Sequence, residues 1–222
     1  MARVTTTPRP AVVVVAGGSG LVGGAVVRRL LSDGARVVVP TRGTGAVVPD
    51  GARVVAHVDW DAPAQLLDVL AEPGWRPTAA VAALGGWWLG PQLVDVDPAQ
   101  WRRLVESHLT AHWLAVRALA PVLAGPDPAY VLLGGAAATD PMPGSGPVNV
   151  TGAGQRMLLH VLRAEPIGER VRFCEVNVRA AVRGDTRNRD PVAEVDRGVV
   201  ASAVVRVLTD PGALAVVEVG AA

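Results

Sequence analysis

The sequence of 222 residues contains no lysine, because all 21 basic residues are arginine. It also has one tyrosine (Tyr130), one phenylalanine (Phe173) and one cysteine (Cys174). The missing lysine excludes mechanisms that need a lysine Schiff base, a lysine general base or a tyrosine–lysine pair. The single cysteine excludes an internal disulfide, a Cys-x-x-Cys redox motif and a four-thiolate metal site. A reducing, cytoplasmic location is therefore expected.

Charge and long apolar runs are also scarce. Charged residues make up 18% of the chain and the formal net charge is +1, which offers no basic field for nucleic acid. The longest uncharged apolar run, residues 10–27, contains five glycines and a serine and is a poor membrane span. Residues 1–10 lack the apolar core of a signal peptide. We expect a globular chain with neither a nucleic-acid nor a membrane partner.

Apolar, β-branched runs alternate with amphipathic stretches of helical length, which is typical of a parallel sheet with crossover helices. The predicted strands are residues 11–16, 36–40, 53–58, 78–84, 130–134, 171–176 and 214–219. The predicted helices are residues 21–32, 63–71, 98–123, 148–165 and 195–208. The pattern predicts an α/β fold: one doubly wound domain over residues 1–222, with a seven-stranded, mainly parallel sheet. Residues 1–9 are expected to form an extended or disordered tail.

Three loops rich in glycine and proline follow predicted strands, namely residues 85–98, 136–147 and 179–191. In an open parallel sheet, ligands bind outside the carboxyl ends of the strands. We therefore expect these loops to line the functional crevice.

A glycine-rich turn lies between the first predicted strand and the first predicted helix. Glycines there allow a tight turn and a close backbone approach, and the free N–H groups of the helix favour a pyrophosphate. The predicted contacts of a dinucleotide with this turn are Gly17, Ser19, Gly20, Leu21, Val22 and Gly23. The alternative is a turn with a purely structural role.

The end of the second predicted strand bears on which dinucleotide is bound. An NAD site usually has an acidic residue there for the ribose hydroxyls, whereas this sequence has Thr41 and Arg42. A guanidinium pairs well with a 2′-phosphate. NADP(H) is therefore preferred over NAD, with a solvated loop arginine and no cofactor as the alternative.

With these features the sequence resembles the short-chain dehydrogenase/reductase family, which has a Rossmann-type fold, over nearly its whole length. Gly17-x-x-Gly20-x-x-Gly23 is similar to the glycine motif of the family's extended and atypical branches. Asp59-Trp60 resembles the aspartate segment that contacts adenine, and residues 83–86 stand where the family has Asn-Asn-Ala-Gly. The resemblance implies that Asp59, Trp60, Ala83 and Gly85 also contact the cofactor.

The resemblance also implies that all four catalytic positions of the family are substituted. Val148 stands at the tyrosine position, Gly152 at the lysine, Gly135 at the serine and His108 at the asparagine. In the family the tyrosine exchanges the substrate proton, and the lysine lowers its pKa and holds the nicotinamide ribose. Losing a positioned general acid costs about 10²–10⁴ in rate. Ordinary carbonyl reduction by this route is not expected.

The candidate catalytic residues that remain are His108, Asn149 and Thr151. His108 and His112 are one helical turn apart, and either histidine is suited to proton transfer near neutral pH. Asn149 and Thr151 flank the vacant tyrosine position. No third ligand accompanies the two histidines, so we expect no metal site; the alternative role for the pair is packing.

The remaining predicted pocket residues lie on the three crevice loops and the helices beside them. Trp87 and Trp88 are suited to form an aromatic wall, with a sheet-edge or subunit contact as the alternative. For Asp140 and Arg179, the alternative is that each is a solvated charge on a loop. The full predicted set is Gly86, Trp87, Trp88, His112, Gly135, Asp140, Val148 and Arg179.

Three functions are compatible with these residues. The preferred one is a non-standard enzyme of lyase, isomerase or cyclase type that acts on a small aromatic or polyketide-like molecule in the former redox pocket. The second is a catalytically silent NADP(H)-binding or regulatory module. The third is an atypical NADP-dependent oxidoreductase that takes its proton from His108 or water. For all three, the resemblance implies a homodimer or homotetramer formed through the predicted helices at residues 98–123 and 148–165.

Overall fold

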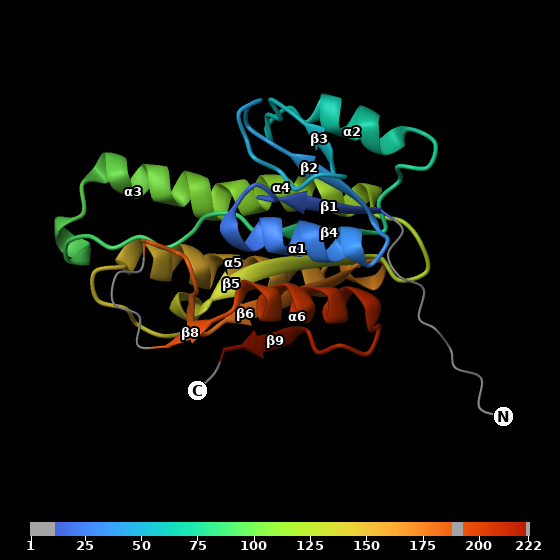
Figure 1. Ribbon diagram of the computed structural model, residues 1–222. Coiled ribbons are helices and arrows are strands. Elements are labelled where there is room, and N and C mark those ends of the chain that lie inside the picture. Colours follow the sequence, from blue (N-terminus) through green and yellow to red (C-terminus); the bar gives the residue numbers. More distant parts are fainter. Residues whose placement is uncertain (1–11, 188–192, 221–222) are drawn as a thin grey trace.

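The computed structural model describes residues 12–187 and 193–220, so the predicted tail at residues 1–9 lies outside the described residues. Seven strands form one parallel sheet in the order β3-β2-β1-β4-β5-β6-β9, with helices on both faces (Figure 1). This confirms the predicted doubly wound, seven-stranded α/β architecture.

The strands follow the apolar runs of the sequence, because a parallel strand covered on both faces needs apolar side chains on both. All five residues of β1, for example, are buried. The seven strands are β1 (Val12–Ala16), β2 (Arg36–Pro40), β3 (Arg53–Val55), β4 (Ala79–Ala82), β5 (Ala129–Gly135), β6 (Arg172–Val178) and β9 (Val216–Val219). Two further short strands, β7 (Ala181–Val182) and β8 (Glu194–Val195), pair separately and were not predicted.

The helices also lie where the apolar spacing predicts them. They are α1 (Leu21–Ser32), α2 (Ala64–Ala71), α3 (Pro98–Val105), α4 (Ala111–Leu119), α5 (Gly146–Ala164) and α6 (Arg197–Thr209). Short 3₁₀ turns occupy Leu93–Asp95, Ala120–Val122, Ala136–Ala138 and Pro166–Glu169. The predicted helix over residues 98–123 is interrupted, because a π-helical segment, Glu106–Thr110, joins α3 to α4.

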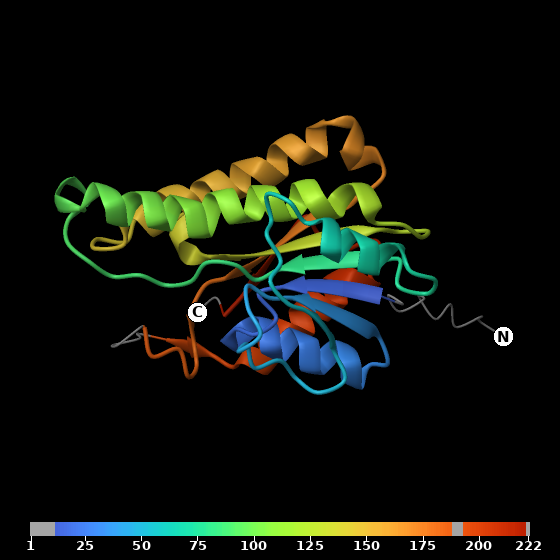
Figure 2. The ribbon, with the colours of Figure 1, turned by 90° about the horizontal axis from the view of Figure 1, so that it is seen from above.

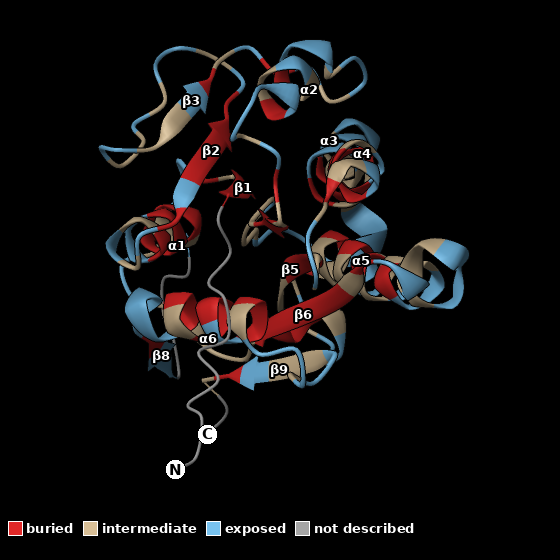
Figure 3. Cartoon of the chain, turned by 90° about the vertical axis from the view of Figure 1, so that its right-hand side faces the viewer, coloured by how far each residue is buried: buried red, intermediate tan, exposed pale blue. Residues whose placement is uncertain are grey.

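The helices form two layers around the sheet. Helices α1 and α6 cover one face, while α2, α4 and α5 pack on the other (Figure 3). Seen from above, α3 and α4 run beside α5 along the second face (Figure 2). Within the described part of the chain, no helix combines the length and apolar character needed to cross a membrane.

The strand order reverses at β1, which lies between β2 and β4. At such a switch point the connections leave to opposite sides, and a crevice opens outside the carboxyl ends of the strands. The turn that follows β1 therefore lies in this crevice.

Candidate functional site

The glycine-rich turn begins with a residue that only glycine can occupy. Gly17 has φ +79°, and a Cβ at this position would overlap the carbonyl oxygen of Ala83, which follows β4. The turn therefore approaches the neighbouring strand end more closely than any side chain would allow.

The next two glycines of the motif connect the turn to α1. The Gly20 N–H donates to the Gly17 carbonyl oxygen at 2.9 Å, and Gly20 is the N-cap of α1 without a side-chain cap. A Cβ on Gly23 would overlap that same Gly17 oxygen. The first turn of α1 has no acidic residue, so its N–H groups face the crevice uncompensated, as an anion site requires.

A cavity of about 360 Å³ opens beside this turn. Its lining joins the start of α1, the ends of β4, β5 and β6, the first turns of α5 and the segment after β7. Of the predicted cofactor and site residues, the cavity is lined by Gly20, Leu21, Val22, Gly23, Ala83, Gly85, Gly86, Trp87, His108, Gly135, Val148, Thr151 and Arg179. The structure thus brings most of the predicted glycine-turn and pocket residues together.

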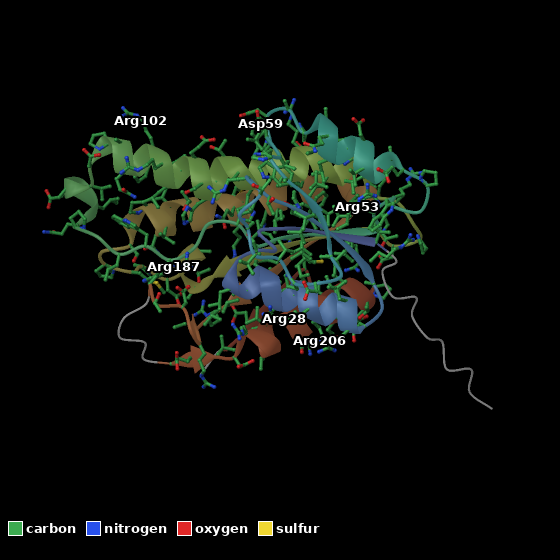
Figure 4. All side chains as sticks on the ribbon, turned by 45° about the horizontal axis from the view of Figure 1, so that its top comes forward. Arg28, Arg53, Asp59, Arg102, Arg187 and Arg206 are labelled. Carbon is green, nitrogen blue, oxygen red and sulfur yellow. The ribbon has the colours of Figure 1, made fainter. Side chains whose placement is uncertain are left out.

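The residues predicted for the adenosine half of a cofactor lie outside this lining. Thr41 is buried and donates its hydroxyl to the Gly43 carbonyl at 2.8 Å, while Arg42 is exposed. Asp59 is exposed (Figure 4) and accepts the Asp61 N–H. Trp60 packs against the core. Ser19 is also exposed, at the turn itself. Their contacts with a cofactor stay predictions.

His108 lies on the cavity wall, where the π-helical segment presents it to the turn after β4. Its Nε2 is 2.8 Å from the Gly86 carbonyl oxygen and 3.1 Å from the Gly86 nitrogen. Its Nδ1 is 2.9 Å from Ser107 Oγ. Both ring nitrogens therefore have partners in either neutral tautomer. The Gly85 position has no room for a side chain, because a Cβ there would lie 2.7 Å from the His108 ring.

The carbonyl of His108 is also held. Gln155, a buried residue on α5, donates its amide to this oxygen at 3.0 Å. A π-helical segment leaves backbone groups outside the regular ladder, and Gln155 satisfies one of them. Sequence reasoning missed Gln155, because an amide within an amphipathic helix gives no signal of its partner.

The other two candidate catalytic residues make bonds to backbone groups. The Asn149 amide donates to the carbonyls of Ala137 and Asp140 at 2.8 and 2.6 Å, and its oxygen accepts the Met142 N–H. Asn149 does not line the cavity. Thr151 lines it but donates its hydroxyl to the Pro147 carbonyl of its own helix at 2.8 Å. Asn149 therefore hydrogen-bonds to the loop before α5 and does not lie in the pocket as predicted.

Val148 and Gly152 both face the cavity from α5, where the family resemblance implies a tyrosine and a lysine. A Cβ on Gly152 would lie 3.2 Å from the Ala138 backbone, so α5 packs closely on the turn after β5. The described wall at these two positions is apolar and carries no proton donor.

Three other predicted pocket residues lie outside the cavity lining, and their placement needs correction. His112 is 0% exposed beneath the pocket, with Nε2 3.4 Å from the Leu84 carbonyl and Nδ1 unpartnered. The Trp88 carbonyl accepts the Ser145 hydroxyl, which ties its loop to the loop before α5. Asp140 pairs with Arg179 at 2.8 Å. Spacing along the chain placed them near the pocket but could not give their orientation.

Two charged residues on the cavity lining, Asp185 and Arg187, were missed by sequence reasoning. The Arg187 Nε and Nη2 donate to the two carboxylate oxygens of Asp185 at 2.8 and 2.7 Å. These hydrogen bonds lower the pKa of Asp185 and raise the pKa of Arg187. The only signal was the Asp-x-Arg spacing on a loop expected to line the crevice, part of which (residues 188–191) lies outside the described residues.

The described residues hold no cluster of three or more histidine, cysteine or acidic side chains suited to a metal ion.

Comparisons with known proteins agree with this geometry. Residues 13–88 match the model of the NAD dependent epimerase/dehydratase family. A protein of Streptomyces violaceoruber, described as ketoacyl reductase 2 of the granaticin polyketide synthase, is 29% identical over 204 residues, covering 86% of this chain and 82% of that protein.

Solved structures share the fold. A short-chain dehydrogenase/reductase family oxidoreductase from Burkholderia thailandensis superposes with a TM-score of 0.78 at 21% identity, over 96% of this chain and 92% of that one. The closed form of a serine dehydrogenase complexed with NADP+ superposes with a TM-score of 0.79 at 18% identity, over 94% of both chains. With the sheet order and the glycine turn, these matches show that the chain has the fold of these short-chain dehydrogenase/reductase structures and is similar in sequence to the relatives named above.

Proposed function

We propose that this chain binds NADP(H) at its glycine turn and holds a small aromatic or polyketide-like molecule in the adjoining cavity, without the tyrosine–lysine relay of carbonyl reduction. The proposal rests on the close approach of Gly17 to the Ala83 backbone and of Gly23 to the Gly17 backbone. Because neither glycine has a side chain and α1 has no side-chain cap, the start of α1 is left open to a pyrophosphate. The cavity beside it has a volume suited to a small ligand.

The preference for NADP(H) rests on the end of β2. Arg42 is exposed there, and residues 40–45 include no acidic side chain to bind the ribose hydroxyls of NAD. A free guanidinium is a good partner for a 2′-phosphate. The structure of the serine dehydrogenase with NADP+ supports the same choice by analogy.

The absence of the relay rests on α5. Val148 and Gly152 offer neither a proton nor a charge to the cavity. His108 is a titratable side chain on the lining, and its Nε2 lies 2.8 Å from the Gly86 carbonyl oxygen. For His108 to act as an acid or base in lyase, isomerase or cyclase chemistry, a ligand must compete with this backbone contact.

The second candidate function is a silent NADP(H)-binding or regulatory module. It is favoured by one observation: the three candidate catalytic side chains, His108, Asn149 and Thr151, already hydrogen-bond to backbone groups. An atypical reductase that takes its proton from His108 or water is the third candidate, and the polyketide ketoacyl reductase among its relatives supports it by analogy.

We further propose that α4 and α5 form a contact with a second copy of the chain in a homodimer or homotetramer. Trp113 on α4 is 49% exposed and Met157 on α5 is 61% exposed, which is unusual for such large apolar side chains on neighbouring helices.

The proposal is tested by following NADPH oxidation in the presence of a bicyclic aromatic ketone, 1-tetralone. We expect the wild-type protein to oxidise NADPH no faster than a protein-free control, because Val148 and Gly152, at the tyrosine and lysine positions, cannot protonate the forming alkoxide. A ketone-dependent rate that disappears in His108→Gln would contradict the proposal and establish the atypical reductase instead.

A further inference from the structure

We propose that Arg187 selects pocket ligands that carry a carboxylate, so that the cavity takes an apolar ring with an anionic end. This inference rests on the proposed function only in assuming that the cavity holds a small molecule. It comes from the position and hydrogen bonding of Arg187 on the segment after β7, at the end of the molecule where the sheet strands terminate (Figure 4).

The Arg187 side chain is 52% exposed, and Asp185 orients its guanidinium. Asp185 accepts from Nε and Nη2 with both carboxylate oxygens and also accepts the Arg187 backbone N–H at 3.2 Å. The Asp185 side chain is 17% exposed, so its carboxylate is a partly shielded support. A planar guanidinium fixed along one edge loses little conformational entropy when its free nitrogen binds a second anion.

That free nitrogen is Nη1. No described group hydrogen-bonds to it, and it lies against Gly86 in the space where a side chain would otherwise be. Gly86 in turn is held by His108. Nη1 therefore lies on the cavity wall beside Gly86, while Asp185 holds the Nε and Nη2 edge of the guanidinium.

The other lining residues suit the rest of such a ligand. Trp87, Met142 and Val148 supply apolar surface, and the charged side chains on the lining are Asp185, Arg179 and Arg187. Both terminal nitrogens of Arg179 are paired, with Thr139 and Asp140, whereas the terminal Nη1 of Arg187 has no partner among the described residues. An apolar body with one carboxylate complements this arrangement.

The test compares two probes that share one ring system, 2-naphthoate and 2-naphthalenemethanol, by calorimetric titration. We expect the wild-type protein to bind the acid more tightly, and Arg187→Gln to weaken the acid about tenfold or more while leaving the alcohol unchanged. Arg183→Gln is the matched control, because Arg183 lies on the same segment, is exposed and does not line the cavity.

Three results would overturn the inference. The first is wild-type protein that binds the acid no more tightly than the alcohol. The second is an equal loss for both probes in Arg187→Gln. The third is an Arg187→Gln protein in which the ratio of the acid and alcohol affinities is unchanged but NADPH binding is weaker, which would make Arg187 a cofactor contact.

The same titrations without cofactor separate this inference from the proposed function. An acid preference that depends on Arg187, in a protein that does not bind NADPH, would support the ligand site and reject the dinucleotide site.

Discussion

At the scale of single residues, His112 shows how burial changes a side chain's chemistry. It is 0% exposed on α4, and this burial lowers the pKa of its imidazole from 6.5 to about 4. Its neutral ring accepts no hydrogen bond at Nδ1 from the described residues. His112 therefore enters the folded protein uncharged and resists protonation.

This gives a prediction for stability against pH. Between pH 6.5 and about 4 the unfolded chain protonates His112 while the folded chain does not, so the unfolded state binds more protons. The free energy of unfolding should therefore fall as the pH falls through this window, by about 3 kcal/mol from this residue. Urea unfolding of the wild type and His112→Leu at several pH values measures the difference.

In His112→Leu the slope over this window should be reduced. The control is His160→Gln, since His160 is exposed on α5 and should leave the slope unchanged. Equal slopes in the wild type and His112→Leu would contradict the buried, neutral histidine.

The two histidines also show what sequence reasoning could and could not predict about residues. Their spacing of one helical turn predicted a shared helix face, and both side chains are buried. Which one reaches the cavity depends on the π-helical segment at His108, which the carbonyl contact with Gln155 and the Gly86 contact stabilise. Those partners are 47 and 22 residues away, so local spacing carries no information about them.

At the scale of elements, the turn between β1 and α1 places the adjacent glycines Gly23 and Gly24 in different surroundings. A Cβ on Gly23 would overlap the Gly17 carbonyl, whereas a Cβ on Gly24 would meet its nearest atom at 3.5 Å, an ordinary contact. Both residues are buried in α1 and differ only in this surrounding.

We therefore expect Gly23→Ala to lower the free energy of unfolding by about 1–3 kcal/mol, because backbone must shift to relieve the overlap. Gly24→Ala, its matched control, should be neutral or gain up to about 1 kcal/mol from better helix propensity. Chemical unfolding measures both. Equal effects of the two substitutions would show that the turn does not pack on α1 as described.

Most elements could be predicted from the sequence because their signals are local. Apolar runs predicted the seven sheet strands, and three- and four-residue spacing predicted the helices to within a few residues. The strand predicted over residues 53–58 ends at Val55, because His57 has a φ of 57° that interrupts the extended backbone, although the Val58 N–H still donates to the Thr41 carbonyl at 2.9 Å. The β7–β8 pair was missed because two-residue strands have no periodicity to detect.

At the scale of the whole molecule, the alternating pattern and the glycine turn together predicted where the functional crevice lies. Strand order follows from right-handed crossovers on both sides of β1, and the cavity lies at the predicted sheet edge. The sequence could not show which loop charges reach that edge. Asp140 lies outside the lining and pairs with Arg179, which lies on it, as Asp185 and Arg187 do. Loop charges have no periodic pattern that would fix their orientation.

The central claim is that this crevice binds NADP(H), and the most direct test is a titration of the protein with NADPH and with NADH. Energy transfer from the tryptophans to the bound nicotinamide reports binding, and Trp87 lies on the cavity itself. We expect saturable binding with NADPH preferred, and loss of that preference in Arg42→Ala. The control is Arg102→Ala, which should keep the preference for NADPH, since Arg102 is an exposed arginine on α3 (Figure 4). Failure of both nucleotides to give saturable transfer would contradict the account.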